Sequence, residues 1–150
     1  MTWKPHVTVA AIIEQDNHFL LVEEKVEGKL VFNQPAGHLE PDESIIDAVI
    51  RETREESGCV FQPEYLVGLY RWKMAEKNRT YIRYGFGGNI KQVIEHAELD
   101  ADIIRILWLS YDEIIEQQSS LRSPLVLQCI DDYRSGQRYS LNLLKDINNG

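Results

Sequence analysis

The sequence predicts an α/β protein, an α/β/α sandwich in which helices cover both sides of a mixed β-sheet. Three observations support this expectation. Strand-like and helix-like segments follow one another along the chain, as they do when helices are layered on a sheet. No linker, repeat or low-complexity stretch interrupts the pattern. The length of 150 residues suits one domain with a sizeable core, so we expect residues 1–150 to form a single domain.

The expected strands are short runs rich in β-branched and aromatic residues. A polar turn at Asp16-Asn17 joins the first two, and the short third strand ends at Gln34-Pro35. Two later strands form a long hairpin around residues 76–79, and one more buried strand follows. In chain order, the expected strands are His6–Ile13, Phe19–Glu24, Lys29–Phe32, Tyr65–Met74, Thr80–Ile90 and Ile103–Leu109.

Three helices are expected among these strands. The first, at about Glu43–Ser57, has an apolar stripe that can be buried against a sheet. Asp42 or, alternatively, Ser44 can cap its first turn, and Gly58 can end it in a left-handed conformation. The other two helices are expected at Tyr111–Gln118 and Pro124–Arg134.

The first helix carries three carboxylates on one side. Successive helical residues are rotated by about 100°, so Glu55 and Glu56 both lie within about 60° of Glu52. Their repulsion is relieved when a hard cation such as Mg²⁺ sits among the oxygens, because such ions prefer carboxylate ligands. The pattern indicates a divalent-metal site suited to phosphates. The alternative is a solvated acidic helix face, which is common in proteins.

The loop and the helix together resemble the signature box of the Nudix hydrolases. Every fixed position of the box is filled, by Gly37, Glu43, Arg51, Glu52, Glu55, Glu56 and Gly58. Thr53 and Cys59 hold the two looser apolar positions, and Thr53 is a mild departure from the usual aliphatic residue. Seven residue types at ~7% background frequency should match by chance in about one window in 10⁸. The resemblance also implies the Nudix α/β/α sandwich.

The resemblance implies roles for the residues of the box. Glu52, Glu55 and Glu56 would bind the metals, and one of these glutamates would orient or deprotonate the attacking water. The Gly37 carbonyl could serve as a further ligand, since a glycine lets the backbone approach closely. Arg51 lies one turn before Glu55 and could hold that carboxylate in an i,i+4 ion pair. The candidate catalytic residues are therefore Glu52, Glu55 and Arg51, and the candidate metal ligands are Glu52, Glu55, Glu56 and Gly37.

Other acidic residues lie near the predicted site. If Glu43 and Arg51 were both helical, they would lie about 12 Å apart, which is too far for an easy direct pair. In the Nudix fold a later loop often supplies an additional metal-binding acid. Three residues of this chain are available for that role: Glu98, Asp100 and Asp102.

Charge is spread unevenly along the chain. The net charge is −8, from 16 basic and 24 acidic residues, which argues against a stable nucleic-acid partner. The segment from Arg71 to Lys91 contains six basic residues and one acidic residue, Glu76. Such a basic lobe beside a carboxylate site would attract a small polyphosphate. For Lys77, Arg79 and Lys91, a role in solubilising a hairpin is the better interpretation.

Four residues are candidate substrate contacts. Trp72 offers a flat stacking surface, and Arg71 precedes it within the basic lobe. Gln34 could hydrogen-bond the edge of a ring, and Arg83 on the partnering strand is the candidate phosphate contact. An aromatic residue at strand spacing is more often part of the core, so the other candidate platforms are weaker: Trp3, Phe32, Tyr70 and Tyr81.

Strings outside the box resemble one bacterial branch of the family: Pro5–Ala10, Asn33–Glu40, Leu121–Val126 and Ser135–Tyr139. That branch contains phosphatases of nucleoside tri- and diphosphates and of hydroxymethylpyrimidine pyrophosphate, a thiamine-pathway intermediate. The resemblance implies Mg²⁺-dependent release of orthophosphate, with Mn²⁺ as an alternative metal. Two other interpretations stay open. One is a pyrophosphatase that releases pyrophosphate from oxidised nucleotides, and the other is a Nudix-like module that binds nucleotides without cleaving them.

The remaining features concern the cellular setting. No apolar run is long enough to span a bilayer, and the N-terminus lacks a signal-peptide pattern. Cys59 and Cys129 show no metal-binding spacing and are expected to be small buried hydrophobic residues, with a disulfide as the alternative. We expect a cytoplasmic enzyme, monomeric or homodimeric, with small phosphorylated substrates and no membrane partner.

Overall fold

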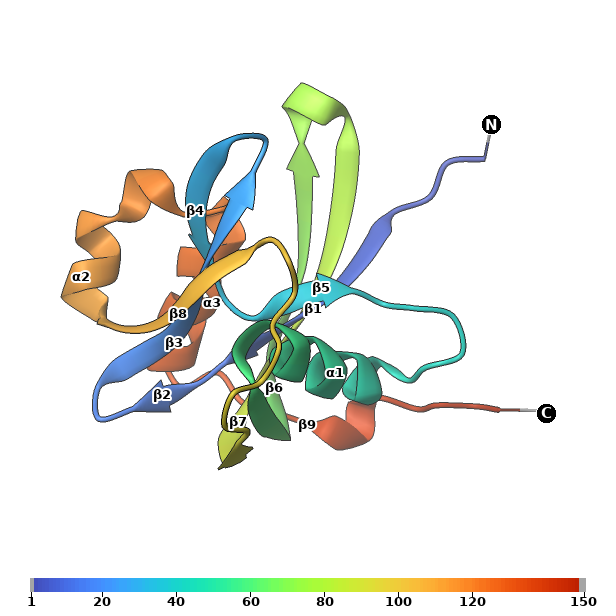
Figure 1. Cartoon of the computed structure of the whole chain (residues 1–150). Helices are drawn as coiled ribbons and strands as arrows, with labels where there is room; N and C mark the ends of the chain where they lie inside the picture. Colours follow the sequence, from blue (N-terminus) through green and yellow to red (C-terminus); the bar gives the residue numbers. More distant parts are fainter. Residues whose placement is uncertain (1, 149–150) are drawn as a thin grey trace.

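Two β-sheets and three α-helices make up the part of the chain that the computed structural model describes, residues 2–148 (Figure 1). The strands are β1 (His6–Ile12), β2 (Glu14–Gln15), β3 (His18–Val26), β4 (Lys29–Asn33), β5 (Ala36–His38), β6 (Cys59–Met74), β7 (Arg79–Val93), β8 (Ile103–Ser110) and β9 (Tyr139–Ser140). The α-helices are α1 (Ile45–Ser57), α2 (Tyr111–Glu116) and α3 (Pro124–Arg134). Short 3₁₀ turns occupy Ala75–Lys77, Gln118–Ser120 and Leu141–Leu143.

The larger sheet is mixed. Its five strands lie in the order β5-β1-β7-β6-β9, with β1 and β7 parallel and the other neighbours antiparallel. In the smaller sheet, β3 pairs with β2, β4 and β8, always antiparallel. The long β6–β7 hairpin projects beyond the rest of the larger sheet (Figure 1).

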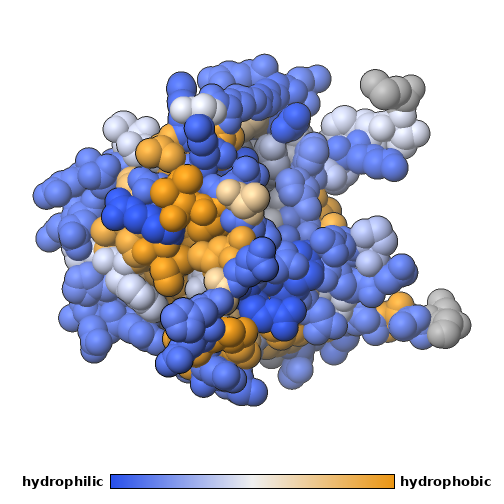
Figure 2. Space-filling view, in the orientation of Figure 1, coloured by the Kyte–Doolittle hydropathy of each residue, from blue (hydrophilic) through white to orange (hydrophobic). Residues whose placement is uncertain are grey.

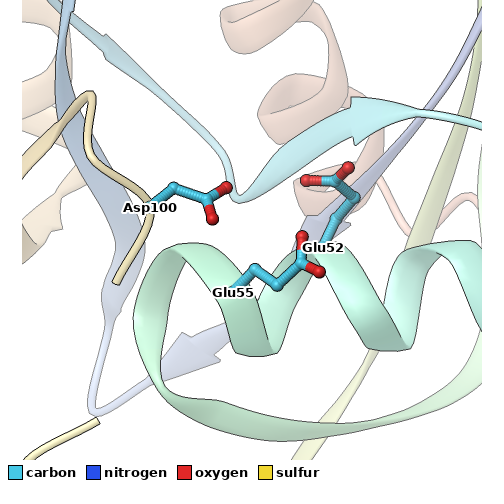
Figure 3. A group of neighbouring side chains, drawn as sticks. All are labelled: Glu52, Glu55 and Asp100. Atoms are coloured by element: carbon cyan, nitrogen blue, oxygen red, sulfur yellow. The ribbon is translucent and has the colours of Figure 1, made fainter. Parts of the chain in front are cut away.

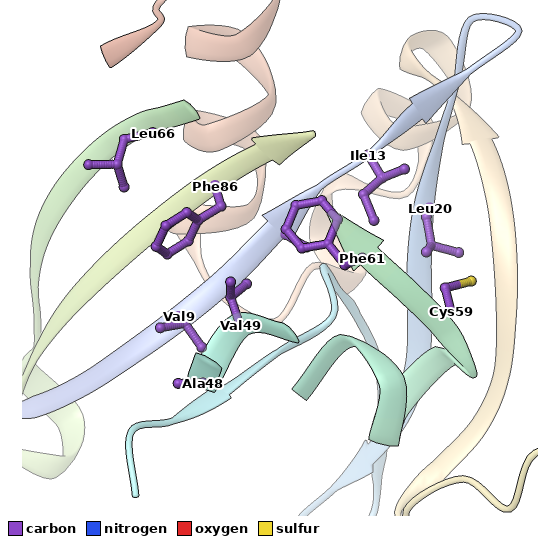
Figure 4. Packing of buried hydrophobic residues seen from close by; sticks show 10 residues of the cluster. Val9, Ile13, Leu20, Ala48, Val49, Cys59, Phe61, Leu66 and Phe86 are labelled. Atoms are coloured by element: carbon purple, nitrogen blue, oxygen red, sulfur yellow. The ribbon is translucent and has the colours of Figure 1, made fainter. Parts of the chain in front are cut away.

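Helices α1 and α3 pack against the larger sheet through two separate hydrophobic clusters. On α1, Val49 is fully buried in a cluster with Val9 of β1 and Phe86 of β7 (Figure 4). On α3, Val126 is buried in another cluster with Ile12. Burying each such side chain contributes about 1.5–3 kcal/mol. The predicted α/β/α sandwich around a mixed sheet is confirmed.

The structure corrects several predicted boundaries. Strand β6 begins at Cys59 rather than Tyr65, so the hairpin is longer than its apolar pattern indicates. Helix α1 begins at Ile45, and its cap is Ser44, whose hydroxyl accepts from an N–H of the first turn at 3.0 Å. Asp42, the other candidate cap, has a positive φ of 66° in the preceding loop.

Other local predictions are confirmed. Gly58 ends α1 with a φ of 74°, and its N–H donates to the carbonyl of Arg54. Helix α3 has the predicted bounds. Cys59 and Cys129 are both buried and both free thiols.

The surface is largely hydrophilic on the side that carries α1 and β5 (Figure 2). Hydrophobic residues gather on the same face over the region of β8, where Ile104 is 53% exposed. Within the described residues, no helix combines the length and the apolar character needed to cross a membrane.

Candidate active site

Three carboxylates converge at one side of α1. Glu52 and Glu55 project from the helix, and Asp100 reaches them from the loop before β8 (Figure 3). One oxygen from each lies within 4.8 Å of the other two. The Asp100 N–H donates to the carbonyl of Glu55 at 3.0 Å, which ties the loop to the helix. Of the three acids that the sequence left open, Asp100 is therefore the one in this cluster.

Gly37 on β5 lies directly against the Glu52 carboxyl group. A Cβ atom at this position would lie 2.1 Å from Glu52 Cδ, far inside van der Waals contact. Only glycine fits here without moving the carboxylate. The close approach places the β5 backbone beside the acidic cluster, as the sequence predicts for residue 37.

Glu56 lies one helical position further on and is almost fully buried. Its exposed fraction is 8%, and its Oε1 accepts a hydrogen bond from the Ala36 N–H at 2.9 Å. Burial raises the pKa of Glu56 to about 8, and the nearby charges of Glu24, Glu52 and Asp100 add to the rise. The free carboxyl group therefore keeps its proton near neutral pH.

The same effect extends to the neighbouring acids. Burial raises the pKa of Glu52, although the hydrogen bond from Arg51 opposes the rise. Burial also raises the pKa of Asp100, with the charge of Glu55 acting in the same direction. A site made only of oxygen donors, in which the charged forms of Glu52, Glu56 and Asp100 are disfavoured without a metal, fits a hard divalent ion.

Arg51 holds the acidic cluster in place. Its Nη1 donates to Glu52 at 2.8 Å and to Glu55 at 3.0 Å, so the predicted i,i+4 pair is present. Its Nη2 donates to the His38 carbonyl at 3.0 Å, and its Nε donates to Glu43 at 2.9 Å. One guanidinium thus orients two carboxylates of the cluster and fastens α1 to β5.

The contact between Arg51 and Glu43 corrects the expectation that these residues are too far apart. Helix α1 begins at Ile45, so Glu43 precedes it in a loop that turns back toward the helix. The Glu43 carboxylate accepts from both Nε and Nη2 of Arg51, at 2.9 and 2.8 Å, and from the Glu40 N–H. These hydrogen bonds, above all that from Arg51, lower the pKa of Glu43.

A pocket with a cavity volume of about 320 Å³ opens beside the cluster. The carboxylates of Glu52 and Glu56 and the backbone at Gly37 form part of its wall. Further lining comes from β1, β3, β4, the β6–β7 hairpin and the start of α3: Thr8, Glu24, Asn33, Trp72, Met74, Tyr81, Arg83, Arg122, Ser123 and Leu125. The pocket is large enough for a small phosphorylated molecule.

The structure separates the four candidate substrate contacts. Trp72 and Arg83 line the pocket. Gln34 is 1% exposed, and its amide donates to the Val126 carbonyl and accepts from Arg83, so it supports Arg83 and does not face the pocket. Arg71 is exposed, next to Trp72 on a strand whose neighbouring side chains point to opposite faces, and it does not line the pocket. Of the four candidates, Gln34 and Arg71 therefore lie outside the lining of this pocket.

The weaker aromatic candidates separate in the same way. Tyr81 lines the pocket and stacks on Trp72, with 5.5 Å between ring centroids. Phe32 is part of the hydrophobic core, and Trp3 is 70% exposed. The Tyr70 hydroxyl donates to Asp132, away from this pocket.

Several polar residues of the pocket were not predicted as site residues from the sequence, among them Glu24, Arg122 and Asn33. Glu24 on β3 is 7% exposed and pairs with Arg122, which lies 98 positions further along the chain. No sequence signal marks a pair so far apart. Asn33 accepts from Arg83 at 3.2 Å. Its place at the end of a strand, next to a second carboxamide, was the only hint of a polar function.

The NUDIX domain family matches residues 4–128, most of the chain, and the protein belongs to this family. It is a hydrolase that acts on phosphoric anhydride bonds, and such hydrolases generally use divalent metals. Among its relatives is the phosphatase NudJ of Escherichia coli strain K12, 42% identical over 146 residues that cover 97% of this chain and 94% of the relative. The prediction of a Nudix hydrolase is confirmed.

Solved structures agree with this assignment. A NUDIX hydrolase from Nitrosomonas europaea superposes with a TM-score of 0.96 at 49% identity, covering 98% of this chain and all of the other. The Escherichia coli ORF135 protein superposes with a TM-score of 0.71 at 24% identity, covering 89% of this chain and 94% of the other. The second likeness concerns the fold alone.

Proposed function

We propose that the protein is a Mg²⁺-dependent phosphohydrolase that releases orthophosphate from nucleoside tri- and diphosphates and from small pyrophosphates such as hydroxymethylpyrimidine pyrophosphate. The observation that carries this proposal is the convergence of Glu52, Glu55 and Asp100 beside a pocket of about 320 Å³. The choice of the phosphatase branch is supported by a relative that is named a phosphatase and is similar to this chain over nearly its whole length. Mn²⁺ is the alternative metal.

The proposal extends to the context of the enzyme. We take residues 1–150 as one Nudix hydrolase domain in the cytoplasm, working as a monomer or a homodimer on small phosphorylated substrates. A stable nucleic-acid partner is not part of this proposal, because the net charge of −8 disfavours one.

Each residue of the cluster has a task in this proposal. Glu52, Glu55 and Glu56 would hold the divalent ion together with the Gly37 carbonyl, and Asp100, which lies in the cluster with Glu52 and Glu55, would be a further ligand. A divalent ion bound there would neutralise charge on the transferring and leaving phosphate oxygens. Either Glu52 or Glu55 would take the proton from the attacking water, because both carboxylates belong to the cluster, and Glu55 is the more accessible of the two.

Arg51 acts in this scheme as a positioning residue. Its guanidinium touches Glu43, Glu52 and Glu55, and all of these contacts are to the protein itself. The side chain is 17% exposed, so it offers little surface to a substrate. It would set the direction of the carboxylates before any ligand arrives.

Product analysis tests the proposal. Purified protein would be incubated with Mg²⁺ and GTP, GDP, ADP-ribose or hydroxymethylpyrimidine pyrophosphate, and orthophosphate and pyrophosphate would be measured separately. We expect orthophosphate from the nucleotides and the pyrimidine. The activity should be lost in Glu55→Gln and Glu56→Gln and kept in Glu116→Gln, a matched change at an exposed glutamate of α2.

The other outcomes are equally informative. Pyrophosphate together with a nucleoside monophosphate would move the protein to the pyrophosphatases. Nucleotide binding without any turnover would contradict the assignment to hydrolysis of these substrates.

A further inference from the structure

Arg83 on β7 is a buried cation without an acidic partner. Its exposed fraction is 4%, yet it lines the pocket. Its Nη1 donates to Gln34 Oε1 at 2.9 Å, and its Nη2 donates to Asn33 Oδ1 at 3.2 Å. Both acceptors are neutral carboxamides, and no carboxylate among residues 2–148 forms an ion pair with it. Within the described residues, Arg83 therefore has no direct ion-pair partner.

The Nε–H group of Arg83 has no acceptor. It is the only buried side-chain nitrogen or oxygen without a hydrogen-bond partner in the described part of the chain. A buried donor left unpaired destabilises the protein, more so when it is charged, and the guanidinium is always charged. Native proteins rarely leave such a donor unused. At the edge of a pocket, this donor implies an acceptor on the ligand.

The position of Arg83 shows which end of the ligand it would meet. In the sheet, Arg83 on β7 lies opposite Thr8 on β1, which in turn lies opposite His38 on β5. Two strand spacings place the Arg83 backbone about 10 Å from the β5 backbone, where Gly37 adjoins the acidic cluster. A ligand whose phosphates lie at the carboxylates would bring its other end toward Arg83.

The surroundings of Arg83 suit a flat ring. Trp72 and Tyr81, which stack on each other, line the same pocket, as do Met74 and Leu125. Aromatic and apolar surfaces of this kind accept the face of a heterocycle. Beside these surfaces, the Nε–H group of Arg83 is a charged donor without an acceptor in the described residues, and it can bind the edge of the ring.

We propose that Arg83 Nε donates a hydrogen bond to a ring nitrogen or carbonyl oxygen of a planar nitrogen heterocycle at the non-phosphate end of the substrate. Arg83 then determines specificity for the ring and is not a phosphate contact. Arginine usually grips phosphate with two parallel donors. Here Gln34 and Cys129 accept from Nη1 and Asn33 accepts from Nη2, so Nε is the guanidinium nitrogen that has no acceptor, and a lone pair on a ring could supply one. This inference rests on the proposed function, because it takes the phosphates to lie at the carboxylates.

Equilibrium binding to a matched pair of ligands tests the inference. The ligands are hydroxymethylpyrimidine pyrophosphate and benzyl pyrophosphate, whose six-membered ring has no nitrogen. The affinity of the protein for each ligand is measured by calorimetry with Ca²⁺. We expect wild-type protein to bind the pyrimidine about 10- to 100-fold more tightly than the benzyl compound. Arg83→Met should lose this preference, and Arg83→Lys should recover little of it, because an ammonium group lacks the Nε direction. Arg79→Met, at an exposed arginine of the same strand, should keep it.

Two results would overturn the inference. An equal loss of affinity for both ligands in Arg83→Met would assign Arg83 to the phosphates. Equal affinity of the wild-type protein for both ligands would also refute it, and this comparison does not require the variant to fold. Hydrolysis with Mg²⁺ is measured separately. A preserved ring preference without turnover would overturn the proposed function and support the role of Arg83.

Discussion

Replacing Glu56 with glutamine isolates the electrostatics of the metal-free site. The Glu56 carboxyl group is 8% exposed, and burial raises its pKa from 4.5 to about 8. The unfolded chain releases this proton near 4.5, whereas the folded protein keeps it to about pH 8. Between these values the folded state binds more protons, so the free energy of unfolding falls as the pH rises. The stabilising contribution is complete below pH 4.5 and lost above pH 8.

The magnitude follows from the size of the shift. Each pH unit is worth about 1.4 kcal/mol, so by pH 8 ionisation of Glu56 should cost the folded state about 3–5 kcal/mol. Glutamine keeps an oxygen that can accept from the Ala36 N–H, and it cannot ionise. Metal-free Glu56→Gln should therefore match wild-type stability near pH 4.5 and exceed it by about 3–5 kcal/mol at pH 8.

Urea unfolding in EDTA, followed by tryptophan fluorescence from pH 4.5 to 9, measures the effect. The chain has three tryptophans, which supply the signal. Glu116→Gln, an exposed substitution on α2, controls for the chemical change. Adding Mg²⁺ at pH 8 should stabilise the wild-type protein more than Glu56→Gln, because the ion favours the ionised carboxylate. Parallel stability curves for wild-type and Glu56→Gln from pH 5 to 8 would refute the reasoning.

Three other substitutions have defined outcomes. Gly37→Ala should lower kcat/KM about 100-fold, because the alanine Cβ would lie 2.1 Å from Glu52 Cδ and displace that carboxylate. Steady-state measurement of phosphate release gives kcat/KM for the comparison. Arg51→Lys should destabilise the protein by about 2–4 kcal/mol in urea unfolding, since lysine cannot reproduce the guanidinium hydrogen bonds to Glu43 and Glu52. Asp100→Asn should weaken Mg²⁺ binding about tenfold by calorimetry, because one anionic ligand is lost.

Each of these substitutions has a control and a contradicting result. Gly28→Ala provides the comparison outside the site: a Cβ there meets no atom within 4 Å, although the φ of 81° strains alanine. Equal activity of both alanine variants would contradict the role of Gly37. Arg134→Lys provides a comparison for Arg51→Lys, and equal stability losses would show that the Arg51 contacts are ordinary. Asp112→Asn, at an exposed residue, provides a comparison for Asp100, and unchanged Mg²⁺ affinity in Asp100→Asn would remove Asp100 from the metal site.

The core of the site could be predicted because its determinants are local. The spacing of Glu52, Glu55 and Glu56 and the i,i+4 partner Arg51 follow from helical geometry alone. The prediction for Glu43 was wrong because it assumed a longer helix, and a loop can turn back where a helix cannot.

The rest of the pocket could not be predicted because it depends on packing between distant segments. Arg83 meets Asn33 across 50 positions of sequence, and Arg122 meets Glu24 across 98. Whether a residue between two strands, such as Gln34, faces a ligand or a buried neighbour is decided by the segment that packs on it, here α3. The residue pattern of one segment does not show which distant segment will pack against it.

The parallel pairing of β1 with β7 has a consequence for the synthesis of this protein. The register joins His6 to Tyr81, 75 positions apart, so β1 leaves the ribosome long before its neighbour. At about 5–20 residues per second the delay is about 4–15 s. During this time the apolar run Val9–Ile13, at most 1% exposed in the finished fold, lacks one of its two flanking strands. During synthesis this apolar segment therefore depends on protection from aggregation until β7 is made.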